Sequence, residues 1–268
     1  MASVPVPDRF ASARYKVRRA RKHLRDFERE VGLFLTKNVY TVVFDEKSKP
    51  GSCVAKIASI NTAGLDQLAL TAGDVIHNLR SALDHFMFEV SGGATLTAQE
   101  WKKIYFPIYG KDDQPSIKDI HELVTRKTKG ISARLFTALC ALEAYKGGAG
   151  HDIWALNELD NADKHRLVLD IHLAGRRIIV TSKARRKTAP PEQRNGFIVV
   201  GNHDSPLQVG DVIMTVPIGT YDKRYKPRLP LQVRLSEPEI LPGADIKTAL
   251  AHLTDEVERL LERLIPLV

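Results

Sequence analysis

The sequence lacks long apolar runs. Across its 268 residues, no hydrophobic stretch approaches the roughly 20 residues that a helix needs to cross a bilayer. The first residues also lack the apolar segment and small-residue cleavage site of a secretory signal peptide. We therefore expect a cytoplasmic protein with no membrane-spanning segment and no membrane partner.

Cysteine is scarce as well. Cys53 and Cys140 are the only two, too few for a disulfide framework in a chain of this length, so we expect both to be reduced and structural. The patterns Cys-x-x-Cys, His-Glu-x-x-His and Gly-x-x-x-x-Gly-Lys do not occur, which argues against the common zinc sites and the P-loop. We expect no cofactor and, as the leading interpretation, no metal.

Acidic residues are outnumbered by basic ones, 32 to 40, giving a formal net charge of +8. Clustered cations attract polyanions, because each neutralised phosphate releases a condensed counterion. RNA or another polyanion is therefore an expected partner, although a solvated helix face and loop would carry the same residues. The two clusters are Arg14, Lys16, Arg18, Arg19, Arg21, Lys22 and Arg25, and Lys183, Arg185, Arg186 and Lys187.

Apolar residues near both ends of the chain repeat in alternating three- and four-residue steps, from Phe10 to Phe34 and from Ile246 to Leu264. This spacing places them on one side of a helix, so long terminal helices are predicted, each needing an apolar partner. Central helices are predicted over residues 65–90, 131–145 and 153–164.

A period of two predicts β-structure elsewhere. Tyr40–Phe44 and Cys53–Ala58 flank the turn-forming segment Lys47–Gly51, which predicts a β-hairpin. Five more short β-rich runs, divided by Gly, Pro and Asn, are spaced as in an antiparallel meander. They span residues 167–173, 177–182, 197–200, 212–216 and 231–235.

These elements predict an α+β protein, because they lack the regular βαβ alternation of a parallel sheet. Long N-terminal, central and C-terminal helices would form a helical core, with a β-hairpin and an antiparallel β-meander. We expect one elaborated domain over residues 1–268: a helical part with the hairpin (8–166), the meander (167–240) and a C-terminal helix (244–265) that packs back. The seams of the terminal helices also favour a homodimer.

The predicted helix at 65–90 carries a polar row opposite its apolar side. An exposed helix face usually carries Lys, Glu and Gln, whereas this row consists of poorer helix formers. Its three- and four-residue steps bring neighbouring side chains within hydrogen-bonding range. The row is Asp74, His77, Asn78, Ser81, Asp84 and His85; the apolar side is Leu68, Val75, Ile76, Leu79, Ala82, Leu83, Phe86 and Val90.

Three interpretations of the polar row are open. It is a structural hydrogen-bond network that holds the helix in place, a catalytic or ligand-binding surface, or a metal site. In the catalytic case, Ser81 and His85 lie four residues apart and could act as nucleophile and base. The candidate metal ligands are Asp74 and His77, completed by Asp84, Asp163 or His165.

A second polar cluster spans residues 160–166, with Asp160, Asp163, Lys164, His165 and Arg166, and ends the predicted helix at 153–164. Cations are favoured at the C-terminal end of a helix dipole, which alone could account for three of them. The other interpretation is a phosphate clamp that projects from a helix-to-strand junction. Before the same helix, the segment 147–150 offers backbone amides to a phosphate or serves as a flexible joint.

Two segments resemble a family of uncharacterised bacterial proteins. The family carries a GDxxHNLRSALDH segment followed by a DKHR segment, which here are Gly73–His85 and Asp163–Arg166. The likeness in element order covers most of the chain. This resemblance brings no established activity.

Within the first segment, Arg80 and His85 also resemble the R-x4-H motif of HEPN domains, helical modules that include metal-independent endoribonucleases of the toxin and defence type. The resemblance implies that His85 is a general acid or base on RNA and that Arg80 stabilises the charged phosphorane. The resemblance also implies an active site that, as is common in HEPN domains, is formed by residues of two chains. Ser81 stands where nucleolytic members commonly have Asn, Asp or His, and Arg80 and His85 lie about 140° apart around a helix.

The leading hypothesis is therefore an RNA-interacting, HEPN-like endoribonuclease. Its rival is a non-catalytic binding module in which the polar row is a structural network. The candidate catalytic residues are His85, Arg80, Asp84 and His77; the candidate substrate-binding residues are Asp74, Asn78, Ser81, Asp163, Lys164, His165 and Arg166.

Overall fold

The structure is a computed structural model that describes residues 8–110, 114–166, 169–175, 179–180, 197–198, 205–217, 229–236, 240–241 and 245–268. The chain forms two compact units, a helical one of residues 1–29, 66–170 and 237–268 and a β-rich one of residues 30–65 and 171–236. The predicted α+β class is confirmed. The prediction of one elaborated domain stays a prediction.

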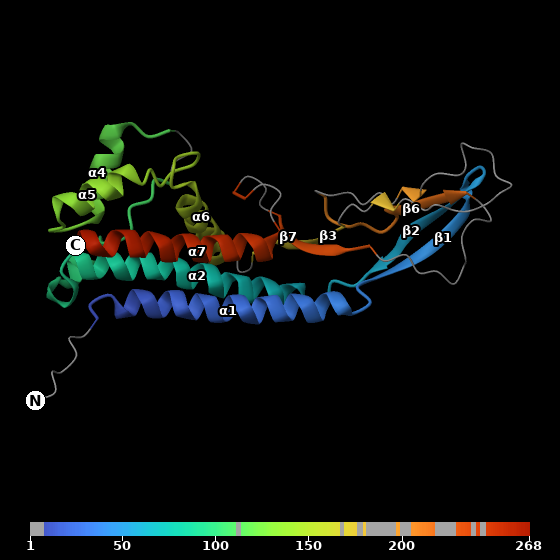
Figure 1. Cartoon of the computed structure of the whole chain (residues 1–268), viewed down its shortest axis with the longest axis horizontal. Coiled ribbons are helices and arrows are strands. Elements are labelled where there is room, and N and C mark those ends of the chain that lie inside the picture. Colours follow the sequence, from blue (N-terminus) through green and yellow to red (C-terminus); the bar gives the residue numbers. More distant parts are fainter. Residues whose placement is uncertain are drawn as a thin grey trace, which may run out of the picture. The chain divides into compact units, whose positions relative to one another are not determined.

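Three long helices form the centre of the helical unit: α1 (Ala11–Thr36, up to Arg29), α2 (Leu65–Val90, from Asp66) and α7 (Ile246–Leu264) (Figure 1). The rings of Phe10 and Phe86 lie 5.5 Å apart, and His23 lies beside Asp74, so α1 and α2 run antiparallel. Arg21 of α1 pairs with Asp255 and Glu258 of α7. The apolar positions predicted for both terminal helices are all buried.

Helix α2 has the bounds predicted from its sequence, and glycines with positive φ follow it, Gly92 at 121° and Gly93 at 54°. Such angles suit glycine because it has no Cβ to clash with the backbone. The eight apolar positions predicted to face the core are at most 6% exposed. The apolar side of α2 is thus buried along the length of the helix.

Shorter helices complete the helical unit. Helix α5 is shorter than predicted, α6 extends the predicted segment at both ends, and α4 was not predicted at all. Helix α4 begins with a capping box, in which Ser116 accepts from the amide of Asp119 and the Asp119 carboxylate accepts from the amide of Ser116. The elements are η1 (Gly93–Thr95), α3 (Ala98–Trp101), α4 (Ile117–Lys127), α5 (Ala133–Ala141), α6 (His151–Arg166) and η3 (Ile265–Leu267).

In the β-rich unit, the predicted hairpin is confirmed: β1 (Tyr40–Lys49) and β2 (Ser52–Ile60) pair antiparallel. They belong to a five-stranded sheet of order β1-β2-β6-β5-β4. The predicted meander differs from the observed pairing, because β3 and β7 leave it to form a two-stranded sheet of their own. The later strands are β3 (Ile171–Gly175), β4 (Ile179–Val180), β5 (Phe197–Ile198), β6 (Val212–Pro217) and β7 (Leu231–Leu235).

The core of the β-rich unit lies over β2 and β6. Tyr40 packs against it, and its hydroxyl accepts a hydrogen bond from the amide of Leu229 at 2.5 Å. Cys53 is fully buried there as a free thiol, as its predicted structural role requires. The buried cluster is Cys53, Ala55, Ile57, Ile213, Met214, Val216 and Leu229.

None of the helices in the described part of the chain is both long and apolar enough to span a membrane.

Candidate functional site

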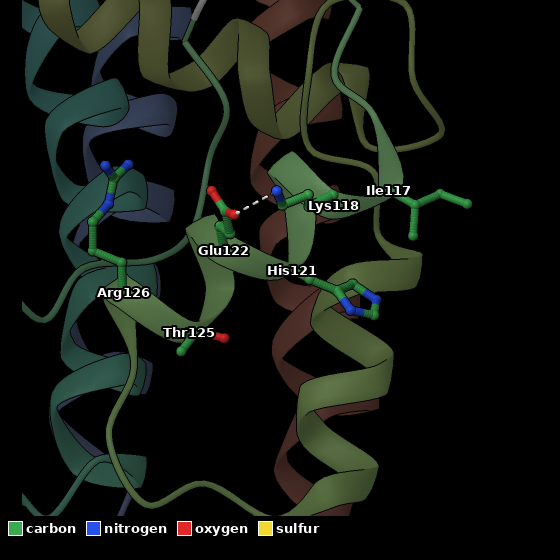
Figure 2. Close-up of a pocket in the computed structure, with 6 residues that line it drawn as sticks. All are labelled: Ile117, Lys118, His121, Glu122, Thr125 and Arg126. Atoms are coloured by element: carbon green, nitrogen blue, oxygen red, sulfur yellow. Dashed lines mark ion pairs between the residues drawn. The ribbon is translucent and has the colours of Figure 1, made fainter.

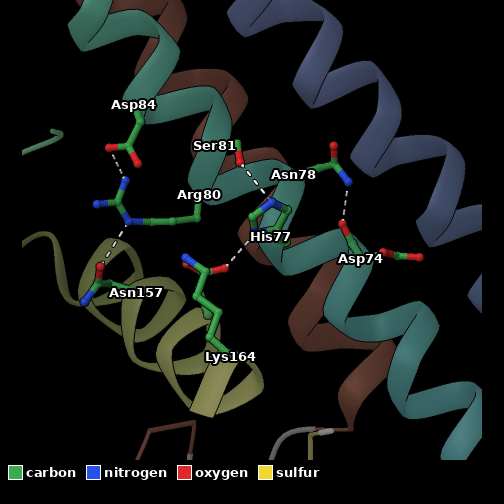
Figure 3. A network of polar contacts seen from close by, with 9 residues as sticks. Asp74, His77, Asn78, Arg80, Ser81, Asp84, Asn157 and Lys164 are labelled. Atoms are coloured by element: carbon green, nitrogen blue, oxygen red, sulfur yellow. Dashed lines mark hydrogen bonds and ion pairs between the residues drawn. The ribbon is translucent and has the colours of Figure 1, made fainter. Parts of the chain in front are cut away.

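Residues 73–85 of α2 and residues 163–166 of α6 meet in the helical unit, because the two helices pack antiparallel in a fixed register. Asp163 lies against Gly73, where a Cβ would come within 2.6 Å of its Oδ1. One turn along, His77 contacts Asp160. One turn further, Arg80 contacts Asn157 (Figure 3). Glycine at position 73 therefore allows the close approach that brings the polar residues of both helices together.

Arg80 is held at the buried side of this contact and is 8% exposed. Its Nε donates to Asn157 Oδ1 at 3.0 Å, and its Nη1 donates to Asp84 Oδ1 at 2.5 Å. The same Asp84 oxygen accepts the backbone amide of Phe106 at 2.9 Å. Arg80 and Asp84 thus connect α2, α6 and the segment that follows α3.

His77 links a buried carboxylate to a hydroxyl. Its Nδ1 lies 3.2 Å from Oδ1 of Asp160, and its Nε2 lies 3.5 Å from Oγ of Ser81. The Asp160 side chain is 2% exposed, whereas that of His77 is 51% exposed. Lys164 donates to the other Asp160 oxygen, so this buried charge has two partners.

Three carboxylates gather at the end of the α2–α6 contact. Burial raises the pKa of Asp163, and the negative charges of Asp160 and Asp74 raise it further. Asp74 is exposed on its α2 face, and its backbone carbonyl accepts from Nδ2 of Asn78 at 2.7 Å. Asn78 is itself buried, so its side chain bonds within α2 and is not presented to solvent.

His85 lies apart from this contact. Its half-buried imidazole has a lowered pKa, first because burial disfavours the charged form and then because Lys16 of α1 is close, while Asp84 and Glu89 oppose the shift. Among the hydrogen bonds and ion pairs of the described residues, none joins His85 to Arg80. The structure brings Arg80, Asp84 and Asn157 together, and it sets His85 beside α1.

The second predicted cluster is only partly brought to the site. Lys164 reaches Asp160, whereas His165 is exposed on the last turn of α6. The side chain of Arg166 and the basic segment 183–187 lie outside the described residues. Within the described ranges, no group of three or more His, Cys, Asp or Glu side chains is arranged to hold a metal ion.

The glycine-rich turn before α6 uses its amides internally. Gly148 donates to the carbonyl of Tyr145, Gly150 to that of Glu143, and Gly147 to Nδ1 of His151. A Cβ at Gly148 would lie 2.3 Å from the carbonyl oxygen of Glu143, so the turn is also tightly packed. These amides are therefore not directed at a phosphate.

The basic residues of α1 divide into paired and unpaired ones. Arg14 binds Asp8 and Lys22 binds Asp26, while the Arg21 guanidinium binds two carboxylates of α7. Three exposed arginines form no ion pair with a described residue, and one of them stacks its guanidinium 4.5 Å from the ring of exposed Tyr15. They are Arg18, which makes the stack, Arg19 and Arg25.

A shallow surface hollow lies along α4, and none of the predicted site residues lines it (Figure 2). Lys118 and Glu122 pair across it at 3.8 Å, and His121 makes an edge contact with Phe136. The lining comes from a single helix face, so it lacks the enclosing walls of a ligand site. It consists of Ile117, Lys118, His121, Glu122, Thr125 and Arg126.

Asp160 and Asn157 complete the network but were not predicted as site residues. With Lys164 they occupy one face of α6 at three- and four-residue steps, the same spacing that revealed the row on α2. That spacing is the signal from which both residues could have been predicted.

Comparison of the chain with protein-family models, with curated proteins and with solved structures finds no match.

Proposed function

We propose that the protein is an RNA-interacting, metal-independent endoribonuclease of the HEPN-like toxin or defence type, with His85 as its general acid and base. The observation that carries the proposal is the position of His85, a partly exposed imidazole beside Lys16 on the most basic helix of the unit. The lowered pKa of His85 favours the neutral imidazole near neutral pH, which is the form that accepts a proton.

In the proposed reaction, neutral His85 takes the proton of an RNA 2′-hydroxyl, whose oxygen attacks the adjacent phosphorus. The bond to the 5′-oxygen breaks, and that oxygen receives a proton from the imidazolium, leaving a cyclic phosphate and a 5′-hydroxyl. Lys16 supplies positive charge beside the imidazole. In this scheme Arg80 does not contact the RNA. Its hydrogen bonds to Asp84 and Asn157 hold α2, which carries His85, against α6.

RNA contact is assigned to the exposed side of α1. Arg18, Arg19 and Arg25 have no competing carboxylate among the described residues, so their charge is available to phosphates. Tyr15 is 60% exposed and offers a ring face on which a base can stack.

The test is cleavage of total RNA and of a labelled single-stranded RNA by the purified full-length chain in EDTA. We expect cleavage, and we expect His85→Gln to remove it while the melting temperature stays close to that of the wild type. His121→Gln, at an exposed histidine of α4, is the matched control and should cleave normally. Absence of cleavage, or equal cleavage by His85→Gln, would refute the proposal.

The burial of Arg80 favours a second candidate, a non-catalytic binding module built on a structural network. This candidate predicts that RNA stays intact with the wild-type protein. It also predicts that Arg80→Gln lowers the free energy of unfolding by about 2 kcal/mol or more, because Asp84 would lose its charged partner in a poorly hydrated site. Cleavage that depends on His85 would exclude it.

A further inference from the structure

We infer that Ser81, His77 and Asp160 form a second catalytic site, in which Ser81 is a nucleophile toward carboxylic esters. The inference does not depend on the ribonuclease proposal, which uses none of these three side chains. It rests on the order in which their atoms meet: carboxylate, imidazole, hydroxyl. A Ser-His-Asp triad is recognised by these roles and this geometry, whatever the fold or chain order.

Each ring nitrogen of His77 has the partner that its role requires. Nδ1 faces the carboxylate of Asp160 at 3.2 Å, which favours the tautomer with the proton on Nδ1. Nε2 is then the lone-pair nitrogen, and it lies 3.5 Å from Ser81 Oγ. That distance is at the long end of hydrogen bonding, as is common for catalytic pairs without substrate.

Asp160 is fixed more firmly than an ordinary surface carboxylate. Its side chain is 2% exposed. One of its oxygens pairs with His77 of α2, and the other pairs with Lys164 of its own helix. A carboxylate that is held in this way orients the imidazole and stabilises the imidazolium that forms during the reaction.

The Ser81 hydroxyl departs from the usual behaviour of hydroxyls in helices. Thr71, Thr137 and Thr254 each donate to the carbonyl four residues back in their helices. The hydroxyl of Ser81 lies instead against the imidazole four residues back. Ser81 is partly exposed and the His77 side chain is half exposed, so a substrate can reach both.

The chemical step balances within these residues, the ester and water. Ser81 Oγ attacks the carbonyl carbon while His77 Nε2 takes the hydroxyl proton. The bond to the leaving alcohol then breaks, and His77 returns the proton to that oxygen. Water, deprotonated by the same nitrogen, hydrolyses the acyl-serine and restores the site.

The experiment treats the full-length chain with a fluorophosphonate probe and with 4-nitrophenyl acetate, and locates adducts by peptide mass spectrometry. We expect a covalent adduct on Ser81 that is absent from Ser81→Ala. His77→Gln, which still donates to Asp160 but cannot act as a base, should slow labelling by about a hundredfold. Ser12→Ala, at a partly exposed serine in the first turn of α1, is the matched control and should label like the wild type.

We expect both test variants to keep the fold, because alanine is the best helix former and glutamine is a good one. Melting curves followed by far-UV circular dichroism check this. An adduct on Ser81 whose rate falls in His77→Gln supports the inference. Absence of an adduct on Ser81, including labelling only at other side chains, overturns it. Equal labelling rates in wild type and His77→Gln also overturn it, because Ser81 would then react without its base.

Discussion

At the scale of single residues, Gly73 decides how closely α2 and α6 approach. A Cβ at this position would lie 2.6 Å from Oδ1 and 2.8 Å from Oδ2 of Asp163, distances that real Cβ atoms do not show. Gly73 and Asp163 are therefore complementary parts of one contact. Neither can be enlarged without displacing the other.

We predict that Gly73→Ala lowers the free energy of unfolding by about 1 kcal/mol, because overpacking of about 1–3 kcal/mol exceeds the gain of up to about 1 kcal/mol in helix propensity. Gly32→Ala is the control: it is also helical, has no atom within 4 Å of the added methyl, and should stabilise its helix by about 0.5–1 kcal/mol. Denaturant unfolding measures both. Stabilisation of equal size at the two positions would contradict the close contact.

Asp163 gives a pH-dependent prediction at the same contact. Burial and the charges of Asp160 and Asp74 raise its pKa, so its ionised form is less favourable in the folded than in the unfolded chain. This penalty is absent below the unfolded pKa of the carboxyl and is fully present once the pH exceeds the folded pKa.

Asp163→Asn should therefore raise the melting temperature at pH 7, and the gain should shrink as the pH falls into the range where the carboxyl takes up a proton. Thermal unfolding between pH 3 and pH 7 measures the difference between variant and wild type. A constant difference in melting temperature across that range, or a destabilised variant at pH 7, would contradict the prediction. It would show that burial and the neighbouring carboxylates do not disfavour the ionised form of Asp163 in the folded chain.

At the scale of elements, α2 is covered on more sides than an ordinary amphipathic helix. Apolar residues on its one side are fully buried, and Asn78 and Arg80 on other sides are buried as well. Arg80 is tolerated there because its guanidinium finds Asp84 and Asn157. The helix therefore derives its stability from packing along nearly its whole length.

We predict that Leu79→Ala lowers the free energy of unfolding by about 2–5 kcal/mol, because Leu79 is fully buried and its removal leaves a cavity. Leu70→Ala on the same helix is the matched control. Leu70 is 49% exposed, so this change should stay within about 0.5 kcal/mol. Denaturant unfolding compares the two, and similar losses at both positions would contradict the burial of α2 described here.

Elements that depend on interactions between residues close in sequence could be predicted, whereas those that depend on distant residues could not. Periodicity and the glycines after α2 are local, so its bounds and its buried positions were predicted correctly. Helix α4 also has a local signal in its sequence, the Ser116–Asp119 capping box. Strand pairing is not local, and β3 and β7 pair with each other for reasons that no short window contains.

The candidate site could also be predicted only where it depends on residues of one helix. The sequence reveals the polar row on α2, because it lies on one helix, but it does not reveal which helix faces that row. Asp160 and Asn157 become partners of His77 and Arg80 only through the packing of α6. The same packing turns Arg80 toward α6 and leaves His85 beside α1, so residues five apart in the chain serve different contacts.

At the scale of the whole molecule, positive charge is unevenly distributed. Much of the net +8 falls on α1. Carboxylates of α7 pair with Arg21, whereas the exposed Arg18, Arg19 and Arg25 pair with no carboxylate among the described residues. An arginine that forms no ion pair with a described residue can bind a phosphate without first breaking such a pair. The electrostatic contribution to polyanion binding should therefore be concentrated in a few residues.

We predict that binding of single-stranded RNA weakens with salt and that Arg18, Arg19 and Arg25 carry most of this dependence. Each phosphate contact contributes about 0.7 to the slope of log K against log salt concentration, so replacing all three by glutamine should reduce the slope by about 2. The control replaces Lys102, Lys118 and Arg134, three exposed cations of the same unit, and removes equal charge. Fluorescence anisotropy between 50 and 200 mM salt, roughly the range over which such contacts are lost, measures both. Equal slope changes in the two triple variants would mean that RNA responds to net charge alone, and α1 would then not be its binding surface.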